Sequence, residues 1–226
     1  MLSFHNDPAI KEKYCARVAA HIKADELIHG KYWEGGKGCA VGCTIHGSSH
    51  KAYEDELGIP EWLAGLQDTL FEGMVNGDSK KFVADFLPAI PIGVNLDRVK
   101  YQFCAYLMRE NIERVESLKI ADDLKQKVLA AIRGVLSLHE EAAETGEWNE
   151  SAAESAWFAA EYAESAARSA WSAARSAESA ARSAWSAARS AESAARFAWS
   201  AAESAAWSAA YKKHGDELLR LLREAK

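Results

Sequence analysis

The chain contains only four prolines among 226 residues, and it has no long apolar run. A membrane span needs roughly 20 consecutive apolar residues, so we expect no transmembrane helix. A basic start followed by an apolar run is also missing, so we expect no secretory signal and a cytoplasmic protein. The four cysteines are then expected to be thiols or metal ligands and not disulfides; they are Cys15, Cys39, Cys43 and Cys104.

Concentrated positive charge is lacking as well, because the formal net charge is −6. Nucleic-acid-binding proteins usually present a basic face, so we expect no nucleic-acid partner. No segment shows the period-two alternation of a half-buried strand, and the longer apolar patterns have helical spacing. The sequence therefore predicts an all-α protein.

Composition divides the chain into three parts. Residues 151–210 contain 41 alanines or serines among 60 positions, and six of the eight tryptophans lie in or beside this stretch. We expect a helical domain at 1–146 that contains a Gly-rich Cys/His segment, a heptad-repeat helix at 147–213, and an amphipathic helix at 214–226. The first part is long enough for one hydrophobic core.

The first domain carries several helix signals. Asp7 followed by Pro8 predicts a helix start, and Gly30 predicts its end. Pro60 predicts another start. Further helices are expected at 79–90, 96–118 and 120–142, with Pro88 and Pro91 separating the first two.

Residues 155–210 repeat every seven residues, most clearly as Ser-Ala-Trp-Ser-Ala-Ala-Arg at 169–175. The second, fifth and sixth positions share one side of a helix and are almost all alanine. A strict heptad predicts a left-handed coiled coil. No N-terminal helix is long enough to cover so long a stripe, so we expect a homo-oligomer through residues 147–213. The alternative is a solitary Ala-rich helix. Gly215 predicts the end of this helix, before a tail whose apolar face is Leu218, Leu219, Leu221 and Leu222.

Two groups of residues carry candidate chemistry. His21, Asp25 and His29 are four residues apart on the first predicted helix. We expect His21 and Asp25 to face inward, either as an oriented base or metal-ligand pair, or as a structural pair. The second group is the Gly-rich segment, where four zinc-competent side chains lie within 12 residues; they are Cys39, Cys43, His46 and His50.

The Gly-rich segment allows three further interpretations. Cys39 or Cys43 is a reactive thiolate at a helix N-terminus, with His50 or His21 as the base and Asp25 nearby. Alternatively, the backbone N–H groups from Gly36 to Ala40, which include Gly38, hold an anionic ligand with help from Lys37. In the third interpretation the glycines only permit close packing, and the thiols are small buried apolar groups.

The chain resembles a family of uncharacterised phage, prophage and bacterial proteins at three places, which are Trp33–Cys43 (WEGGKGCAVGC), His50 and Leu57-Gly58-Ile59-Pro60. The resemblance covers roughly the first 140 residues, implies no activity, and carries over no catalytic residue. It implies a phage-associated accessory role. Some small phage accessory proteins are oligomeric binders that sequester host defence signals.

Our leading hypothesis is a homo-oligomeric helical protein that captures a small anionic, nucleotide-like ligand. The candidate ligand-binding residues are Trp33, Gly36, Lys37, Gly38, Cys39, Cys43, His50, His21 and Asp25. The first alternative is an enzyme that uses the Cys and His residues on a nucleotide-like substrate. The second is a structural or protein-interaction module built on the heptad helix.

Overall fold

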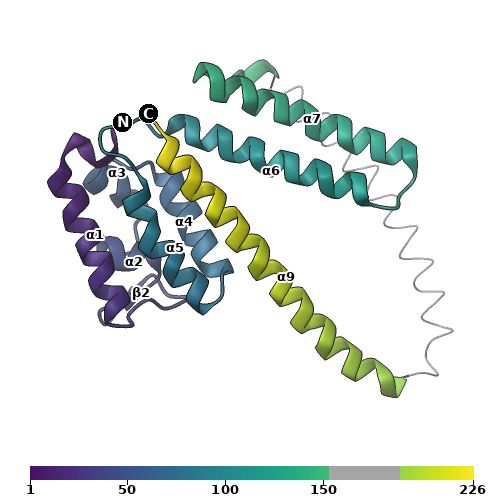
Figure 1. Ribbon diagram of the computed structural model, residues 1–226, viewed down its shortest axis with the longest axis horizontal. Helices are drawn as coiled ribbons and strands as arrows, with labels where there is room; N and C mark the ends of the chain where they lie inside the picture. Colours follow the sequence, from purple (N-terminus) through teal and green to yellow (C-terminus); the bar gives the residue numbers. More distant parts are fainter. Residues whose placement is uncertain (153–188) are drawn as a thin grey trace. The chain divides into compact units, whose positions relative to one another are not determined.

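The computed structural model describes residues 1–152 and 189–226, and the regular elements of this part are helices together with one small hairpin. The all-α prediction is therefore confirmed. The structure forms two compact units, Met1–Lys100 with Glu203–Lys226, and Tyr101–Ala202 (Figure 1). Most of the predicted heptad helix lies at 153–188, outside the described residues.

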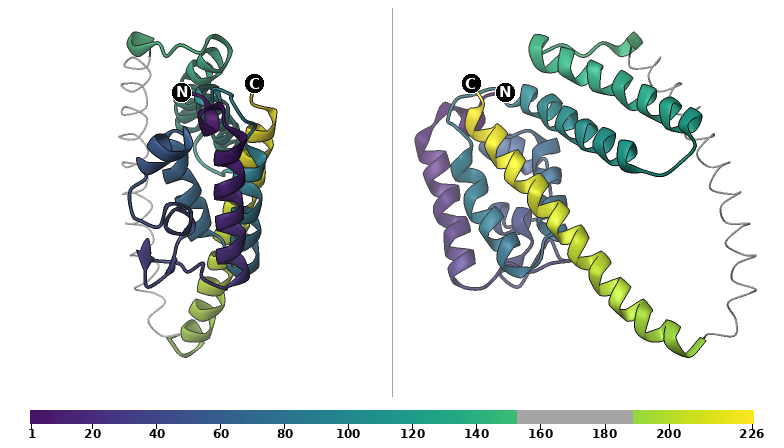
Figure 2. Two further views of the ribbon diagram at one scale, coloured as in Figure 1. Left: turned by 90° about the vertical axis from the view of Figure 1, so that its left-hand side faces the viewer. Right: turned by 45° about the vertical axis from the view of Figure 1, so that its right-hand side comes forward.

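The first unit is built from short helices around one core. Its elements are η1 (Ser3–Asn6), α1 (Pro8–Lys23), β1 (Trp33–Glu34), β2 (Lys37–Gly38), α2 (Ala40–Ile45), α3 (Ala52–Leu57), α4 (Glu61–Gly73), α5 (Asn76–Ala89), the start of α6 (Asp97–Ser117) and the end of α9 (Arg189–Glu224). Helices α1 and α5 lie side by side (Figure 2), and α2 packs against both α1 and α4. The side chains that fill the core include Phe4, Tyr14, Tyr53, Phe71 and Phe86.

Helix α1 begins as predicted but ends early. The Asp7 carboxylate accepts a hydrogen bond from the Ala9 N–H at 2.8 Å, with Pro8 in the first helical position. The helix stops at Lys23, and Asp25 takes a left-handed conformation with φ of 57°. The predicted end at Gly30 is wrong. The next residues pair with Gly38, whose N–H donates to the Glu26 carbonyl at 3.1 Å, and this pairing replaces further helix.

The Gly-rich segment contains a β-hairpin that the sequence analysis did not expect. Trp33 pairs with Gly38, and Glu34 pairs with Lys37. Gly35 and Gly36 form the turn, with φ of 57° and 86°. Two successive positive φ values are typical of a type I′ turn, which glycine adopts without steric cost. Two-residue strands are too short for an alternating pattern, so the sequence carried no strand signal.

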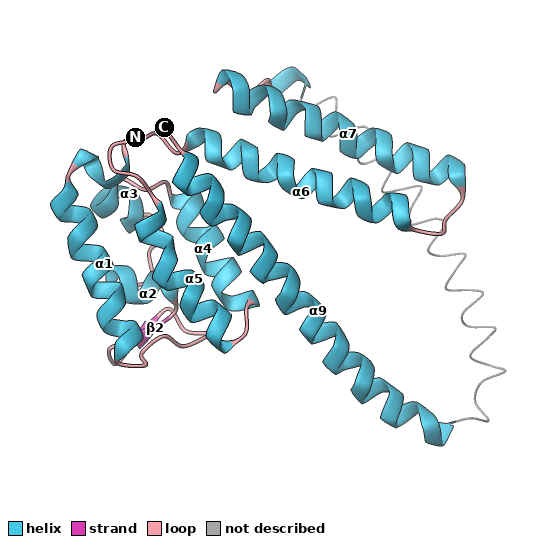
Figure 3. Cartoon of the chain, in the orientation of Figure 1, coloured by secondary structure: helices cyan, strands magenta, loops and turns pink. Residues whose placement is uncertain are grey.

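The other predicted helices are confirmed, with ends shifted by a few residues. They are α5, α6 and α7 (Asp122–Thr145). In the second unit α6 and α7 run antiparallel, joined by a short loop (Figure 3). Two exposed ion pairs link the helices, one between Arg109 and Glu140 at 2.6 Å and one between Arg133 and Glu116 at 2.9 Å.

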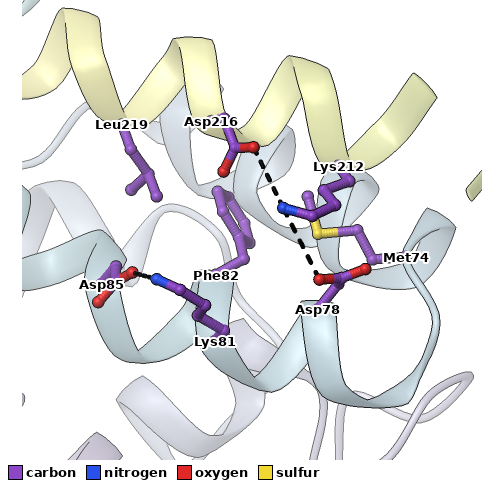
Figure 4. A pocket seen from close by; sticks show the side chains of 8 residues that line it. All are labelled: Met74, Asp78, Lys81, Phe82, Asp85, Lys212, Asp216 and Leu219. Carbon is purple, nitrogen blue, oxygen red and sulfur yellow. Dashed lines mark hydrogen bonds and ion pairs between the residues drawn. The ribbon is translucent and has the colours of Figure 1, made fainter. Parts of the chain in front are cut away.

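Helix α9 continues through Gly215, so the predicted stop and the separate helix at 214–226 are wrong. A Cβ atom at Gly215 would lie 2.3 Å from Met74 Cε, so α9 packs closely against the Met74 side chain at this glycine. The predicted apolar face is confirmed, because Leu218, Leu219, Leu221 and Leu222 are all buried. Figure 4 shows Lys212 of α9 between two carboxylates, at 3.2 Å from Asp216 and 3.8 Å from Asp78 of α5.

Candidate functional site

The backbone of the Gly-rich segment is largely engaged in its own fold. The Cys39 N–H donates to the Lys31 carbonyl at 2.7 Å, and the Gly38 N–H donates to Glu26. The Cys39 Sγ caps α2 by accepting a hydrogen bond from the Gly42 N–H at 3.5 Å. The amides of Gly38 and Cys39 are therefore not available to an anion, contrary to that part of the sequence prediction. Lys37 is exposed on β2.

Glycine is required in this segment because a carbonyl approaches it closely. A Cβ atom at Gly38 would lie 2.0 Å from the Tyr32 oxygen, and one at Gly42 would lie 1.5 Å from the same oxygen. This observation agrees with the interpretation in which the glycines allow close packing. The close approach also holds Tyr32 beside Cys39.

Cys39 lies at a pocket of about 310 Å³ that we call the Cys39 pocket. Its wall is formed by Gly30, Lys31, Tyr32, Cys39, Asp68 and Glu72. The Cys39 Sγ and one oxygen from each of Asp68 and Glu72 lie within 4.8 Å of one another. Both carboxylates come from α4, where a spacing of four residues places them one turn apart on the same face. Neither Asp68 nor Glu72 was among the site residues predicted from the sequence.

Two polar atoms, one on the pocket wall and one beside it, have no hydrogen-bond partner at ordinary distances among the described residues. They are Asp68 Oδ1 and His50 Nε2, and both are buried. The His50 Nε2 lies 3.8 Å from the other Asp68 oxygen, while the His50 ring meets the Tyr32 ring edge to face at 5.6 Å between centroids. Glu72, in contrast, accepts hydrogen bonds from the Gly30 N–H at 3.0 Å through both oxygens. Cys39 and His50 are thus both neighbours of Asp68.

The pocket has a negative electrostatic character. Burial, and then the Asp68 carboxylate, raise the pKa of the Cys39 thiol to about 12. Asp68 also raises the pKa of the Tyr32 hydroxyl, followed by burial. Both shifts disfavour additional negative charge at this position.

Cys43 belongs to a different environment. Its thiol is fully buried and donates to the Gly38 carbonyl at 3.4 Å, and burial raises its pKa to about 11. His46, at the C-terminus of α2, contacts His21 and not His50. No group that joins Cys39, Cys43, His46 and His50 is found in the described part of the chain, so the four predicted zinc ligands do not converge.

His21 forms a second cluster, away from Asp25. Its Nδ1–H donates to Glu26 Oε2 at 2.6 Å, and its Nε2 lies 2.8 Å from the His46 Nε2. The Trp33 ring stacks on His46 with centroids 4.6 Å apart. Glu26 thus takes the role that the sequence analysis assigned to Asp25. Asp25 itself is exposed and bound to Lys80 at 2.5 Å, which lowers its pKa through a hydrogen bond and charge.

The histidine pair predicts a loss of stability in mild acid. The pKa of His46 lies below its ordinary value because of burial, the Arg17 charge and His21, and Glu56 and Glu26 only partly oppose this. As the pH falls, His46 is therefore protonated at a higher pH in the unfolded chain than in the folded protein. The free energy of unfolding consequently falls as the pH drops below about 6.5.

Urea denaturation at several pH values checks this prediction. His46→Asn keeps a residue that tolerates the observed φ of 54°. We expect this variant to lose part of the acid sensitivity, whereas His29→Gln retains it. An unchanged pH dependence in His46→Asn contradicts the assignment.

Comparison with protein-family models, with curated proteins and with solved structures found no match. None of the described helices is long and apolar enough to cross a membrane.

Proposed function

We propose that this protein binds a small ligand in the Cys39 pocket and that the ligand is positively charged. The observation that carries the proposal is the convergence of a thiol and two carboxylates within 4.8 Å. Lys31, the positive residue of the pocket wall, is paired with Glu34. Two carboxylates beside a buried thiol attract a cation and repel an anion.

The size of the pocket supports a small ligand. Small-molecule sites usually span about 300–1,000 Å³, and this pocket, at about 310 Å³, lies at the lower limit. The proposal keeps the ligand-capture role that the sequence suggested and reverses the charge of the ligand. In a phage-associated setting, the role is stoichiometric capture of a host molecule.

The second part of the proposal is self-association through the heptad repeat. The buried residues of the described end of α9 are Ser208, Gly215, Leu218, Leu219, Leu221 and Leu222. Ser208, Gly215 and Leu222 occupy the fifth heptad position and Leu219 the second, which are alanine positions of the repeat, while Leu218 and Leu221 occupy the first and fourth. Four of the six buried residues therefore share heptad positions with the alanine stripe, and this supports the use of the stripe as a packing face.

Light scattering of the full chain tests self-association. We expect a mass above one copy, and a fall toward one copy when Ala173 and Ala180 are both replaced by Glu. Ser172→Glu with Ser179→Glu is the matched control, because the fourth heptad position lies away from the stripe. A single-copy mass for the wild type at all concentrations contradicts this part of the proposal.

Calorimetric titration tests the cation pocket, with zinc and putrescine as cationic probes and AMP as an anionic probe. We expect at least one cation to bind and AMP not to bind. Asp68→Asn and Glu72→Gln should each weaken binding about tenfold or more, equivalent to about 1.4 kcal/mol. Asp123→Asn removes an exposed carboxylate on α7 and serves as the control. Binding of AMP alone, or of no probe, overturns the proposal.

A cysteine-dependent enzyme is the second candidate. The proximity of both Cys39 and His50 to Asp68 favours it, since a thiol, an imidazole and a carboxylate are the parts of a nucleophilic site. The raised pKa of Cys39 opposes it, because the thiolate is the nucleophile.

Alkylation of Cys39 separates the two candidates. With a pKa of about 12, the thiolate fraction at pH 8 is about a thousandfold below that of an ordinary thiol. We expect iodoacetamide to label Cys39 correspondingly slowly in the folded protein and rapidly after denaturation, as read by peptide mass spectrometry. Rapid labelling of the folded protein at neutral pH favours the enzyme.

A further inference from the structure

We propose that the cation of the Cys39 pocket is a divalent metal ion of the zinc class, bound by Cys39 Sγ and by one oxygen each of Asp68 and Glu72. This inference rests on the proposed cation pocket and names its ligand. The three donor atoms already lie within 4.8 Å of one another. Ligands at zinc distances of about 2.0–2.3 Å lie closer together than this limit, so metal binding requires only a small contraction.

An unpartnered carboxylate oxygen of Asp68 supports an ion at this site. Asp68 Oδ1 is buried and has no hydrogen-bond partner at ordinary distances among the described residues. The nearby Cys39 thiol interacts with the Asp68 carboxylate, which contributes to the raised pKa of that thiol. A buried polar atom without a partner destabilises the fold, and an ion is one of the few groups that offset this cost. The Asp68 side chain is only 13% exposed, so water satisfies it poorly.

The donor set selects the kind of metal. Magnesium and calcium prefer sites built from oxygen alone, whereas a thiolate favours zinc and chemically similar ions. Three protein ligands leave one position of a tetrahedral ion open, which is the arrangement of metal sites that bind a further molecule. The open space of the Cys39 pocket provides room for that molecule next to the ion.

His50 is assigned as a positioning residue and not as a ligand. Its Nε2 lies 3.8 Å from Asp68 Oδ2, and its ring packs against Tyr32. A small shift lets an Nε2–H donate to the carboxylate and orient its other oxygen toward the ion. Removing an outer partner of this kind usually weakens metal binding by about 10- to 100-fold.

Cobalt titration of the metal-free full chain tests this inference, because cobalt bound to a thiolate produces a charge-transfer absorption. We expect the absorption to saturate at one equivalent per chain, to disappear on addition of zinc, and to be unaffected by excess magnesium. Cys39→Ser should abolish it. Asp68→Asn and Glu72→Gln should each weaken cobalt binding about tenfold or more, and His50→Gln should have a similar effect.

Cys43→Ser and His46→Asn are the matched controls, because neither residue lies at the Cys39 pocket. We expect both variants to keep the absorption and the affinity. The inference is overturned if the wild type shows no thiolate absorption, or if Cys43→Ser loses it while Cys39→Ser retains it. If putrescine binds in a way that depends on Glu72 and cobalt does not bind, the metal assignment is wrong and the proposal of a cation pocket is retained. If neither probe binds, both proposals are wrong.

Discussion

Replacing Gly42 by alanine adds one methyl group and is expected to destabilise the first unit by about 3 kcal/mol or more. The added Cβ would lie 1.5 Å from the Tyr32 carbonyl oxygen, and neither atom belongs to a flexible side chain. The backbone from Lys31 to Trp33 must therefore move away from α2. Since this backbone forms one wall of the Cys39 pocket, ligand binding should be lost as well.

Urea denaturation measures the effect, and Gly65→Ala is the matched control. Gly65 lies within α4, and a Cβ atom there meets nothing within 4 Å. Because alanine is the better helix former, this control should stabilise the protein by about 0.5–1 kcal/mol. A cost below about 1 kcal/mol for Gly42→Ala contradicts the close approach of Tyr32.

Replacing Leu222 by alanine is expected to cost about 3 kcal/mol, within the range for a fully buried leucine. The side chain has no exposed surface and lies on the α9 face that packs on the first unit. The C-terminal helix is thus an integral part of the core, although about a hundred residues separate it in sequence from the rest of that unit.

The same denaturation assay checks this prediction, with Leu118→Ala as the control. Leu118 follows α6 and is 45% exposed, so its truncation should change the free energy of unfolding by less than about 0.5 kcal/mol. Similar small effects for Leu222→Ala and Leu118→Ala contradict the docking of α9.

Local patterns predicted the helices because helix formation is decided within a few turns. The Asp7 and Pro8 start of α1 and the extents of α5 to α7 follow from caps and apolar spacing. The end of α1 was wrong because Gly38, about a dozen residues farther along, pairs with the backbone at Glu26 and Ile28. Gly215 was predicted to end the helix because glycine often follows a helix C-terminus, but here it lies inside α9 where the helix packs closely against Met74.

The candidate site was only partly predictable, because residues that are far apart in the sequence come together to form it. The Gly-rich segment drew attention to Cys39 and His50 because their chemistry is visible in the sequence. Asp68 and Glu72 look like ordinary polar positions of an amphipathic helix, and only the packing of α2 on α4 brings them to Cys39. Their spacing of four residues was the available signal.

Native mass spectrometry of the full-length chain, exchanged into volatile buffer after incubation with zinc, tests the central claim most directly. The account predicts one ion per chain in the wild type and in Asp123→Asn, and a bare chain in Cys39→Ser and in Asp68→Asn combined with Glu72→Gln. A bare wild-type chain, or equal metal content in all four proteins, would contradict it.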